Sequence, residues 1–285
     1  MVVALVGTLG ACNLSAETVA QPDETADQAH WAMPLDEYSM QPVDSVRYSY
    51  AANLLETPCF SQGGFDVPDP WFDIDVIVSR ANVNAMGRLL LSPESASKWG
   101  YQKAPQESDL SQIEARDSVI GQMRNDTPGF GEVFDRCVEE TYDTFGEQWV
   151  GAENYALGLA SNASADARED PSVVEAAQSW RECMANVGAG VLAAFPLDMP
   201  TQSMVDSWGS DAEGVPSASE ISVAMSDAQC RESSGFTDAL YGAEWQAQQK
   251  YLNENRETLE AGREVLQEWS SKVDTIIGSH VGQNQ

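Results

Sequence analysis

"TDALYGAEWQAQQKYLNENRETLEAGREVLQEWSSKVDTII", running from Thr237 to Ile277, is the stretch from which the architecture of the chain can be worked out. It contains no proline and only two glycines, so nothing within it forces a helix to end. Apolar residues return every seven positions, which places them on one narrow stripe of a helix. The stretch therefore predicts one long C-terminal helix. Its repeating residues are Trp245, Leu252, Leu259, Leu266 and Val273.

The second apolar position of each heptad decides what this helix packs against. A coiled coil needs both positions apolar. Here the second position is not apolar in the first three heptads, which have Gln248, Asn255 and Gly262. It is apolar only in the last two, at Trp269 and Ile276. We therefore expect the helix to pack its seam on its own domain, with an oligomerisation arm as the alternative.

Two helices are predicted before this one from their start and stop signals. Asp44 is a suitable cap for a helix that should end by Thr57, because Pro58 follows. Thr127-Pro128 is a start signal for a second helix with an amphipathic stripe, which Gly146 closes.

Two more helices have clear N-terminal signals. Asp170-Pro171 should begin one, with Val173, Ala177, Trp180 and Met184 on a single face. The sequence Ser217-Ala218-Ser219-Glu220 has the form of a capping box and should begin another.

Strand patterns are scarce, and the best candidate is Phe72 to Ser79, "FDIDVIVS". The predicted fold class is therefore mainly α: a disulfide-pinned helical domain with a long C-terminal helix.

The charge balance of the 285 residues is extreme. There are 15 Lys and Arg against 45 Asp and Glu, a formal net charge of −30. Such a field repels phosphate backbones and anionic lipid head groups, so we expect no nucleic-acid partner. No run of 18 or more apolar residues exists, so no segment has the composition of a membrane-spanning helix.

The N-terminal stretch resembles a bacterial lipoprotein signal. An apolar run ends in Leu9-Gly10-Ala11-Cys12, which looks like a lipobox whose cysteine receives a diacylglyceryl group. No Lys or Arg region precedes it, so we expect the true start of the signal peptide to lie upstream of Met1. The alternative is that residues 1–12 form a buried strand with Cys12 as an ordinary core cysteine. Residues 13–43 are acidic and lack apolar periodicity, which predicts a disordered tether of roughly 30 Å. Residues 44–285 should then form the extracytoplasmic domain.

The number of cysteines agrees with a lipidated Cys12. The chain has five, an awkward number for an exported protein with disulfides. If Cys12 carries lipid, four remain and can pair completely. Zinc is the other use for four cysteines, but no CxxC pair is present. The remaining four are Cys59, Cys137, Cys183 and Cys230.

A repeated pattern favours one of the three connectivities that four cysteines allow. "CFSQGG" at 59–64 and "CMANVG" at 183–188 both place a glycine five residues after a cysteine. A second cysteine follows each in a later predicted helix. This suggests a divergent duplication with Cys59–Cys137 and Cys183–Cys230 pairs, and two halves at 44–150 and 151–285.

Short motifs lie around these cysteines and in the helices that carry them. They are Gly87-Arg88-Leu89, Trp99-Gly100-Tyr101 with Pro105, Arg136-Cys137, Asp170-Pro171-Ser172-Val173 with Trp180, Cys183-Met184, and Ala224 with Asp227 and Cys230. Together they resemble the pattern of a group of predicted actinobacterial lipoproteins. This chain departs from that pattern at Pro58, at Phe60 in place of methionine, and at Arg88 in place of an arginine pair. The resemblance implies an envelope-anchored helical domain and no particular activity.

Residues suited to catalysis or metal binding are few. Neither His30 nor His280 is placed for a Ser-His-Asp or Cys-His site, and no GxSxG motif occurs. Adjacent acids such as Glu139-Glu140 arise by chance among 45. No catalytic residue and no cofactor is therefore predicted. Asp66, Asp69, Asp73 and Asp75 fall in one short loop and are a candidate calcium site, with a Pro-Asp turn as the alternative. An aromatic set is either a ligand groove or core: Trp71, Trp99, Tyr101, Trp180 and Trp208.

These features lead to two functional hypotheses. The first is a non-enzymatic lipoprotein on the outer face of the cytoplasmic membrane, which binds a ligand or assists an envelope protein or transporter. The second is a secreted or anchored hydrolase that uses paired carboxylates, one of which should have a raised pKa inside a cleft.

Overall fold

The computed structural model describes residues 32–70, 91–102, 111–208 and 215–281. Within these ranges the chain forms nine α-helices and two short 3-10 helices and has no strand. The mainly α fold class is therefore confirmed. The predicted strand at 72–79 lies outside the described residues.

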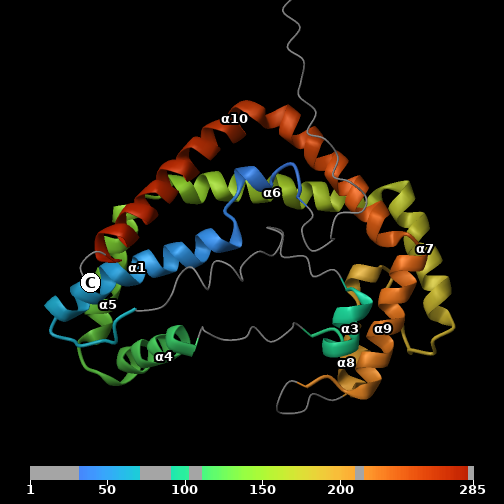
Figure 1. The fold of residues 1–285 in the computed structure, drawn as a ribbon, viewed down its shortest axis with the longest axis horizontal. Coiled ribbons are helices and arrows are strands. Elements are labelled where there is room, and N and C mark those ends of the chain that lie inside the picture. The colour runs from blue at the N-terminus through green and yellow to red at the C-terminus, as the bar shows by residue number, and fades with distance from the viewer. Residues whose placement is uncertain (1–31, 71–90, 103–110, 209–214, 282–285) are drawn as a thin grey trace, which may run out of the picture.

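One long helix organises the molecule. Helix α10 (Phe236–Val281) has 46 residues and bends at Asn255, where φ is −121° and ψ is 15°. Its two arms run down opposite sides of the structure, and α6 (Gln148–Glu169) lies beneath the bend (Figure 1). All five heptad residues are buried against the same chain, as the sequence predicts.

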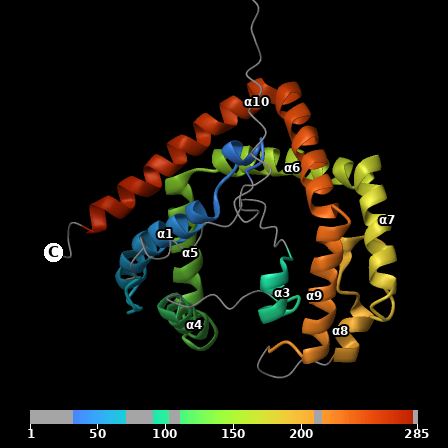
Figure 2. The ribbon, with the colours of Figure 1, turned by 45° about the vertical axis from the view of Figure 1, so that its right-hand side comes forward.

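The remaining helices form two lobes, one at each arm of α10 (Figure 2). The first lobe contains α1 (Pro42–Gln62), α4 (Ser111–Asp126) and α5 (Phe130–Phe145), packed at the C-terminal arm. The second lobe contains α3 (Pro93–Trp99), α7 (Pro171–Ala185), α8 (Gln202–Trp208) and α9 (Ala218–Ser233), at the N-terminal arm. The 3-10 helices are η2 (Asp36–Tyr38) and η3 (Pro196–Asp198).

The two lobes are not the predicted sequence halves 44–150 and 151–285. Helix α6 crosses position 150 without a break. Helix α3 belongs to the first half of the sequence but packs on α9, and the end of α10 packs on α1. The expected boundary at 150 is therefore wrong, because the long helices carry the chain from one lobe to the other.

Each lobe contains one disulfide, with the connectivity that the repeated pattern predicts. Cys59 of α1 is bonded to Cys137 of α5, and their Cα atoms are 5.8 Å apart. Cys183 of α7 is bonded to Cys230 of α9, with Cα atoms 5.7 Å apart. Each bond thus pins two helices that are distant in sequence.

The expected tether, residues 13–43, is packed in its described part. Leu35 and Tyr38 are only 2% and 3% exposed, and they cover the seam between α6 and α10. The Leu35 amide donates to Gln248 Oε1 at 3.1 Å, and the Tyr38 hydroxyl donates to Glu260 Oε1 at 2.9 Å. The boundary at 44 is therefore wrong, because these residues bury apolar surface on the long helix. Residues 13–31 lie outside the described residues.

Helix α1 also differs from its predicted limits. It begins at Pro42, and the Asp44 carboxylate accepts a hydrogen bond of 2.8 Å from the Gln41 amide. It then continues through Pro58 to Gln62. Proline costs the helix one backbone hydrogen bond, but the disulfide at Cys59 and the full burial of Phe60 hold the last turn in place.

The other predicted helix starts agree more closely. Asp170 caps α7 and accepts a hydrogen bond of 2.9 Å from the Ser172 amide. The predicted face of α7 is buried at all four positions. Helix α5 begins at Phe130, shortly after the Thr127-Pro128 signal, and ends before Gly146 as predicted.

Candidate functional site

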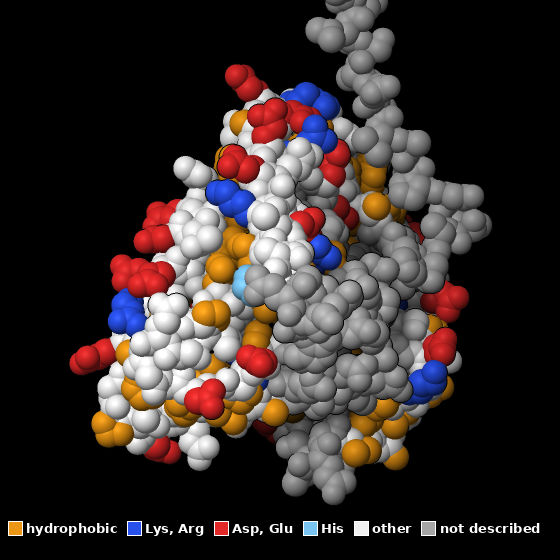
Figure 3. Space-filling view, turned by 60° about the vertical axis from the view of Figure 1, so that its left-hand side comes forward, with side chains coloured by type: hydrophobic (Ala, Val, Ile, Leu, Met, Phe, Trp, Pro, Cys, Tyr) orange, Lys and Arg blue, Asp and Glu red, His pale blue; other side chains and the backbone are white. Residues whose placement is uncertain are grey.

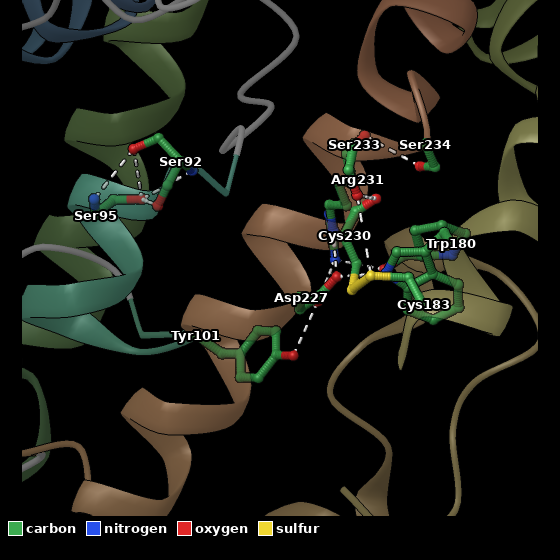
Figure 4. A network of polar contacts seen from close by, with 11 residues as sticks. Ser92, Ser95, Tyr101, Trp180, Cys183, Asp227, Cys230, Arg231, Ser233 and Ser234 are labelled. Carbon is green, nitrogen blue, oxygen red and sulfur yellow. Dashed lines mark hydrogen bonds and ion pairs between the residues drawn. A yellow bond between two sulfur atoms is a disulfide. The ribbon is translucent and has the colours of Figure 1, made fainter. Parts of the chain in front are cut away.

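A fully buried carboxylate lies at the centre of the second lobe. Both oxygens of Asp227 accept hydrogen bonds (Figure 4). The Tyr101 hydroxyl donates to Oδ2 at 2.9 Å, and the Trp180 indole donates to Oδ1 at 2.8 Å. Arg231 donates from Nε to Oδ1 at 2.7 Å and from Nη2 to Oδ2 at 2.8 Å. We call these four side chains the Asp227 network.

The Asp227 network connects four separate segments. Tyr101 follows α3, Trp180 belongs to α7, and Asp227 and Arg231 are one turn apart on α9. Arg231 Nη2 also donates to the Pro196 carbonyl of η3 at 2.6 Å. Burial and the Asp227 charge together raise the pKa of Tyr101, so this hydroxyl stays protonated as a donor.

Tyr101 is positioned by a close approach between α3 and α9. Gly100 has φ of 58°, and a Cβ there would lie 2.7 Å from Glu220 Oε1. The same Glu220 oxygen accepts a hydrogen bond of 3.1 Å from the Tyr101 amide. Ser217 caps α9 as predicted, with its hydroxyl accepting from the Glu220 amide at 3.1 Å. The Glu220 carboxylate is instead directed to the neighbouring segment.

The Asp227 network is built for rigidity. A carboxylate that accepts four hydrogen bonds in a buried position has no lone pair free for a substrate. The Asp227–Arg231 ion pair is buried, and its additional hydrogen bonds offset much of the free-energy cost of removing the two charges from water. Asp227 therefore holds helices together and is not placed for catalysis.

The acids with raised pKa values lie away from the described cavities. Burial raises the pKa of Glu56 in α1 and of Glu153 in α6. Glu153 accepts a hydrogen bond of 2.6 Å from the Met40 amide, so it serves as a cap for the incoming chain. On the face shown in Figure 3, acidic side chains are dispersed over the surface. Neither Glu56 nor Glu153 lines any of the cavities described below.

An open apolar groove of about 590 Å³ runs along the outer side of α7. Residues spaced by three or four along the helix form one wall, so they share a face. The segment that follows α7 forms the other wall. We call this feature the α7 groove. Its lining includes Val174, Ala177, Arg181, Ala185, Leu192 and Phe195.

The groove is supported by the rigid side of the same helix. Trp180 and Cys183 point into the lobe, where the first bonds to Asp227 and the second to Cys230 (Figure 4). Helix α7 is thus held at two successive turns. A binding surface on such a helix loses little conformational entropy when a ligand occupies it.

Two smaller cavities of about 330 Å³ each are also present among the described residues. One is polar and lies between the start of α3 and the start of α10, beside Arg231 and Asp238. The other lies between α6 and α10, beside Tyr155 and Gly262. The first is lined by two acids, Glu232 and Asp238, and by Arg231, which is already paired with Asp227. The second has no charged residue in its lining.

The remaining predicted site residues divide into two sets. Cys12, Asp73, Asp75 and Trp71 lie outside the described residues. Asp66 and Asp69 are exposed, and within the described ranges no three His, Cys, Asp or Glu side chains are arranged to hold a metal.

Within the described residues, one member of the aromatic set is core, two are half-buried and pack against it, and Trp99 is half-buried outside the core clusters. Trp180 is fully buried, and Tyr101 stacks on Trp208 with ring centroids 5.8 Å apart. Sequence reasoning did not identify the role of Arg231, although its spacing of four from Asp227 is a readable signal.

Comparison with known proteins gives no relative from which a function can be transferred. No protein-family model, curated protein or solved structure matches the chain. Within the described ranges, no helix has both the length and the apolar character required to cross a membrane. Function must therefore be inferred from the site itself.

Proposed function

We propose that this chain is an extracytoplasmic lipoprotein, anchored through Cys12, that acts as a non-enzymatic binding component of the cell envelope. The observation that carries the binding role is the α7 groove, an open apolar surface on a helix fixed from behind. Exposed apolar surface of this kind is typical of interaction sites.

The proposed compartment is supported by the cysteines. The two disulfides are consistent with an oxidising, extracytoplasmic compartment. Cys12 is then the fifth cysteine, left over for lipidation at the predicted lipobox. A net charge of −30 keeps the domain away from anionic lipid head groups, so the lipid is its membrane contact.

A binding role is favoured over hydrolysis by the placement of the acids. Asp227 is saturated with hydrogen bonds, and neither Glu56 nor Glu153 lines the α7 groove. The partner in this proposal is an envelope protein or transporter, or a ligand that such a protein handles.

Anchoring is tested by fractionation of a bacterial host that makes lipoproteins. Wild-type protein should be found in the membrane fraction, and Cys12→Ala should release it. The double variant Cys183→Ala/Cys230→Ala is the control, because it loses a disulfide but keeps Cys12. Wild-type protein in the cytosol with its thiols free would contradict the proposal.

The binding role is tested by site-specific photo-crosslinking in the same cells. A photoreactive residue at position 174 reports on the α7 groove, and one at position 138 reports on an exposed valine of α5. The side chains that they replace are 51% and 37% exposed, so both are accessible. We expect a defined crosslinked product at 174 that is absent at 138. The same products at both positions would mean that the groove is not the binding surface.

A further inference from the structure

We infer that the α7 groove binds an amphiphile with an unbranched alkyl chain and a single carboxylate. This inference rests on the proposed function, because it names the ligand class for the same groove. It follows from two independent features: apolar surface that the chain leaves uncovered, and a cation beside it that the chain leaves unpaired.

Exposed apolar side chains lie on the α7 wall of the groove and in the segment that supplies its other wall. Val174 is 51% exposed, and Val191, next to the lining residue Leu192, is 71% exposed. Val187 and Leu197, in the same segment, are also exposed. The cavity of about 590 Å³ lies within the range of about 300–1,000 Å³ that is usual for small-molecule sites. An open groove of this shape suits an extended alkyl chain.

The unpaired cation is Arg181, which is exposed and lines the groove. Every other Lys and Arg side chain in the described part of the chain has a hydrogen bond, an ion pair or an aromatic ring contact. Arg181 has none of these. This is unusual in a chain with three acids for each base. A guanidinium matches the planar geometry of a carboxylate and pairs with it through two hydrogen bonds.

The charge of the surroundings limits the ligand to one anionic group. Glu182 also lines the groove, and its carboxylate accepts a hydrogen bond of 3.5 Å from the Gln178 amide group. Together with the net charge of −30, this repels a strongly acidic protein or an anionic membrane surface. A ligand with a single carboxylate next to Arg181 avoids most of that repulsion.

The test is calorimetric titration of the full chain, with both disulfides intact, using sodium octanoate, decanoate and dodecanoate below their micelle concentrations. We expect saturable binding of one ligand per chain. Burial of each added methylene should tighten the dissociation constant about fourfold. Affinity that does not change with chain length would overturn the inference.

Variants separate the alkyl and carboxylate contributions. Arg181→Gln should weaken decanoate about tenfold and leave 1-decanol unchanged. Val174→Asp should weaken both ligands, because it places a charge against the alkyl chain. The matched controls are Arg256→Gln on α10, an arginine bonded to Asn253 alone, and Val138→Asp on α5. Neither control should change the affinity for either ligand.

Two further results would overturn the ligand class. One is an equal loss of decanoate affinity in Arg181→Gln and Arg256→Gln, and the other is equal affinity of wild-type protein for 1-decanol and decanoate. Failure here leaves the proposed function intact if position 174 still crosslinks to an envelope component. Conversely, carboxylate binding by a chain found in the cytosol would retain the ligand class and reject the anchored role.

Discussion

Trp180 donates a hydrogen bond of 2.8 Å to Asp227, and both side chains are fully buried between α7 and α9. Three residues further along each helix, Cys183 is bonded to Cys230. A hydrogen bond and a disulfide therefore connect the same two helices at successive turns. This double connection is what makes α7 a rigid support for the groove on its other side.

The substitution Asp227→Asn should strongly destabilise the protein. It leaves the Arg231 guanidinium buried without its counter-ion, which costs about 3–5 kcal/mol in comparable buried pairs. For a chain of this size the melting temperature should fall by roughly 10 °C. Thermal unfolding followed by circular dichroism measures the effect.

Tyr251→Phe is the control for that measurement. Tyr251 also donates to a carboxylate, Asp166, at 2.9 Å, but this bond is on the surface. Its loss should change the free energy of unfolding by less than about 0.5 kcal/mol. If Asp227→Asn and Tyr251→Phe have the same melting temperature, the Asp227 network does not stabilise the second lobe.

Removal of either disulfide should destabilise the protein by a similar amount. The loops closed by the bonds are 78 and 47 residues long, and the entropic stabilisation depends only on the logarithm of that length. Each paired Cys→Ala variant should therefore lose about 4 kcal/mol. Guanidinium unfolding of the two double variants measures this. A peptide map in which Cys59 is joined to Cys183 would contradict the connectivity itself.

Two glycine substitutions should have opposite effects. At Gly100 an alanine Cβ would meet the buried Glu220 carboxylate on a backbone with positive φ, so Gly100→Ala should cost about 1–3 kcal/mol. At Gly242, inside α10, nothing lies within 4 Å of an added Cβ. Gly242→Ala should stabilise by about 0.5–1 kcal/mol. The same sign of change in both melting temperatures would show that the close approach of α3 to α9 is not as described.

Stability should increase as the pH falls from neutral towards 5. Burial raises the pKa of Glu56 and Glu153 in the folded state above the ordinary value of 4.5. Between that value and the raised one, the folded state binds more protons than the unfolded state, so stability falls as the pH rises through this window. Release of the repulsion within a chain of charge −30 acts in the same direction.

Chemical unfolding at pH 5.0 and 7.5 checks this expectation. Glu56→Gln should reduce the difference between the two pH values, because the amide does not titrate. Glu139→Gln, an exposed position on α5, should leave the difference unchanged. A wild-type protein that is less stable at pH 5.0 would contradict the raised pKa values of these partly buried carboxyl groups.

Local signals account for the parts of the fold that sequence analysis predicted. The heptad from Trp245 to Val273 and the cap at Asp170 act over one or two turns, so α10 and the buried face of α7 could be read directly. The predictions failed where contacts between residues distant in sequence override the local preference for helix or turn. Pro58 does not end α1, because the buried Phe60 and the disulfide at Cys59 hold the chain beyond it.

Long-range contacts also explain what sequence analysis missed. Leu35 and Tyr38 have no periodicity around them, and they are ordered by partners 213 and 222 residues away. In the Asp227 network, Tyr101 is 126 residues from the carboxylate that it contacts. No spacing rule predicts such a pair. Only the ion pair between Asp227 and Arg231 could have been predicted from local spacing, because the two residues are four positions apart on one helix.

Intact mass spectrometry of the mature protein, purified from a lipoprotein-making bacterial host, tests the lipid anchor and the disulfides together. We expect an N-terminus at Cys12 that carries diacylglycerol, with the four further cysteines oxidised in two pairs. Recovery of a chain that still begins at or before Met1, with all five thiols free, would contradict this expectation.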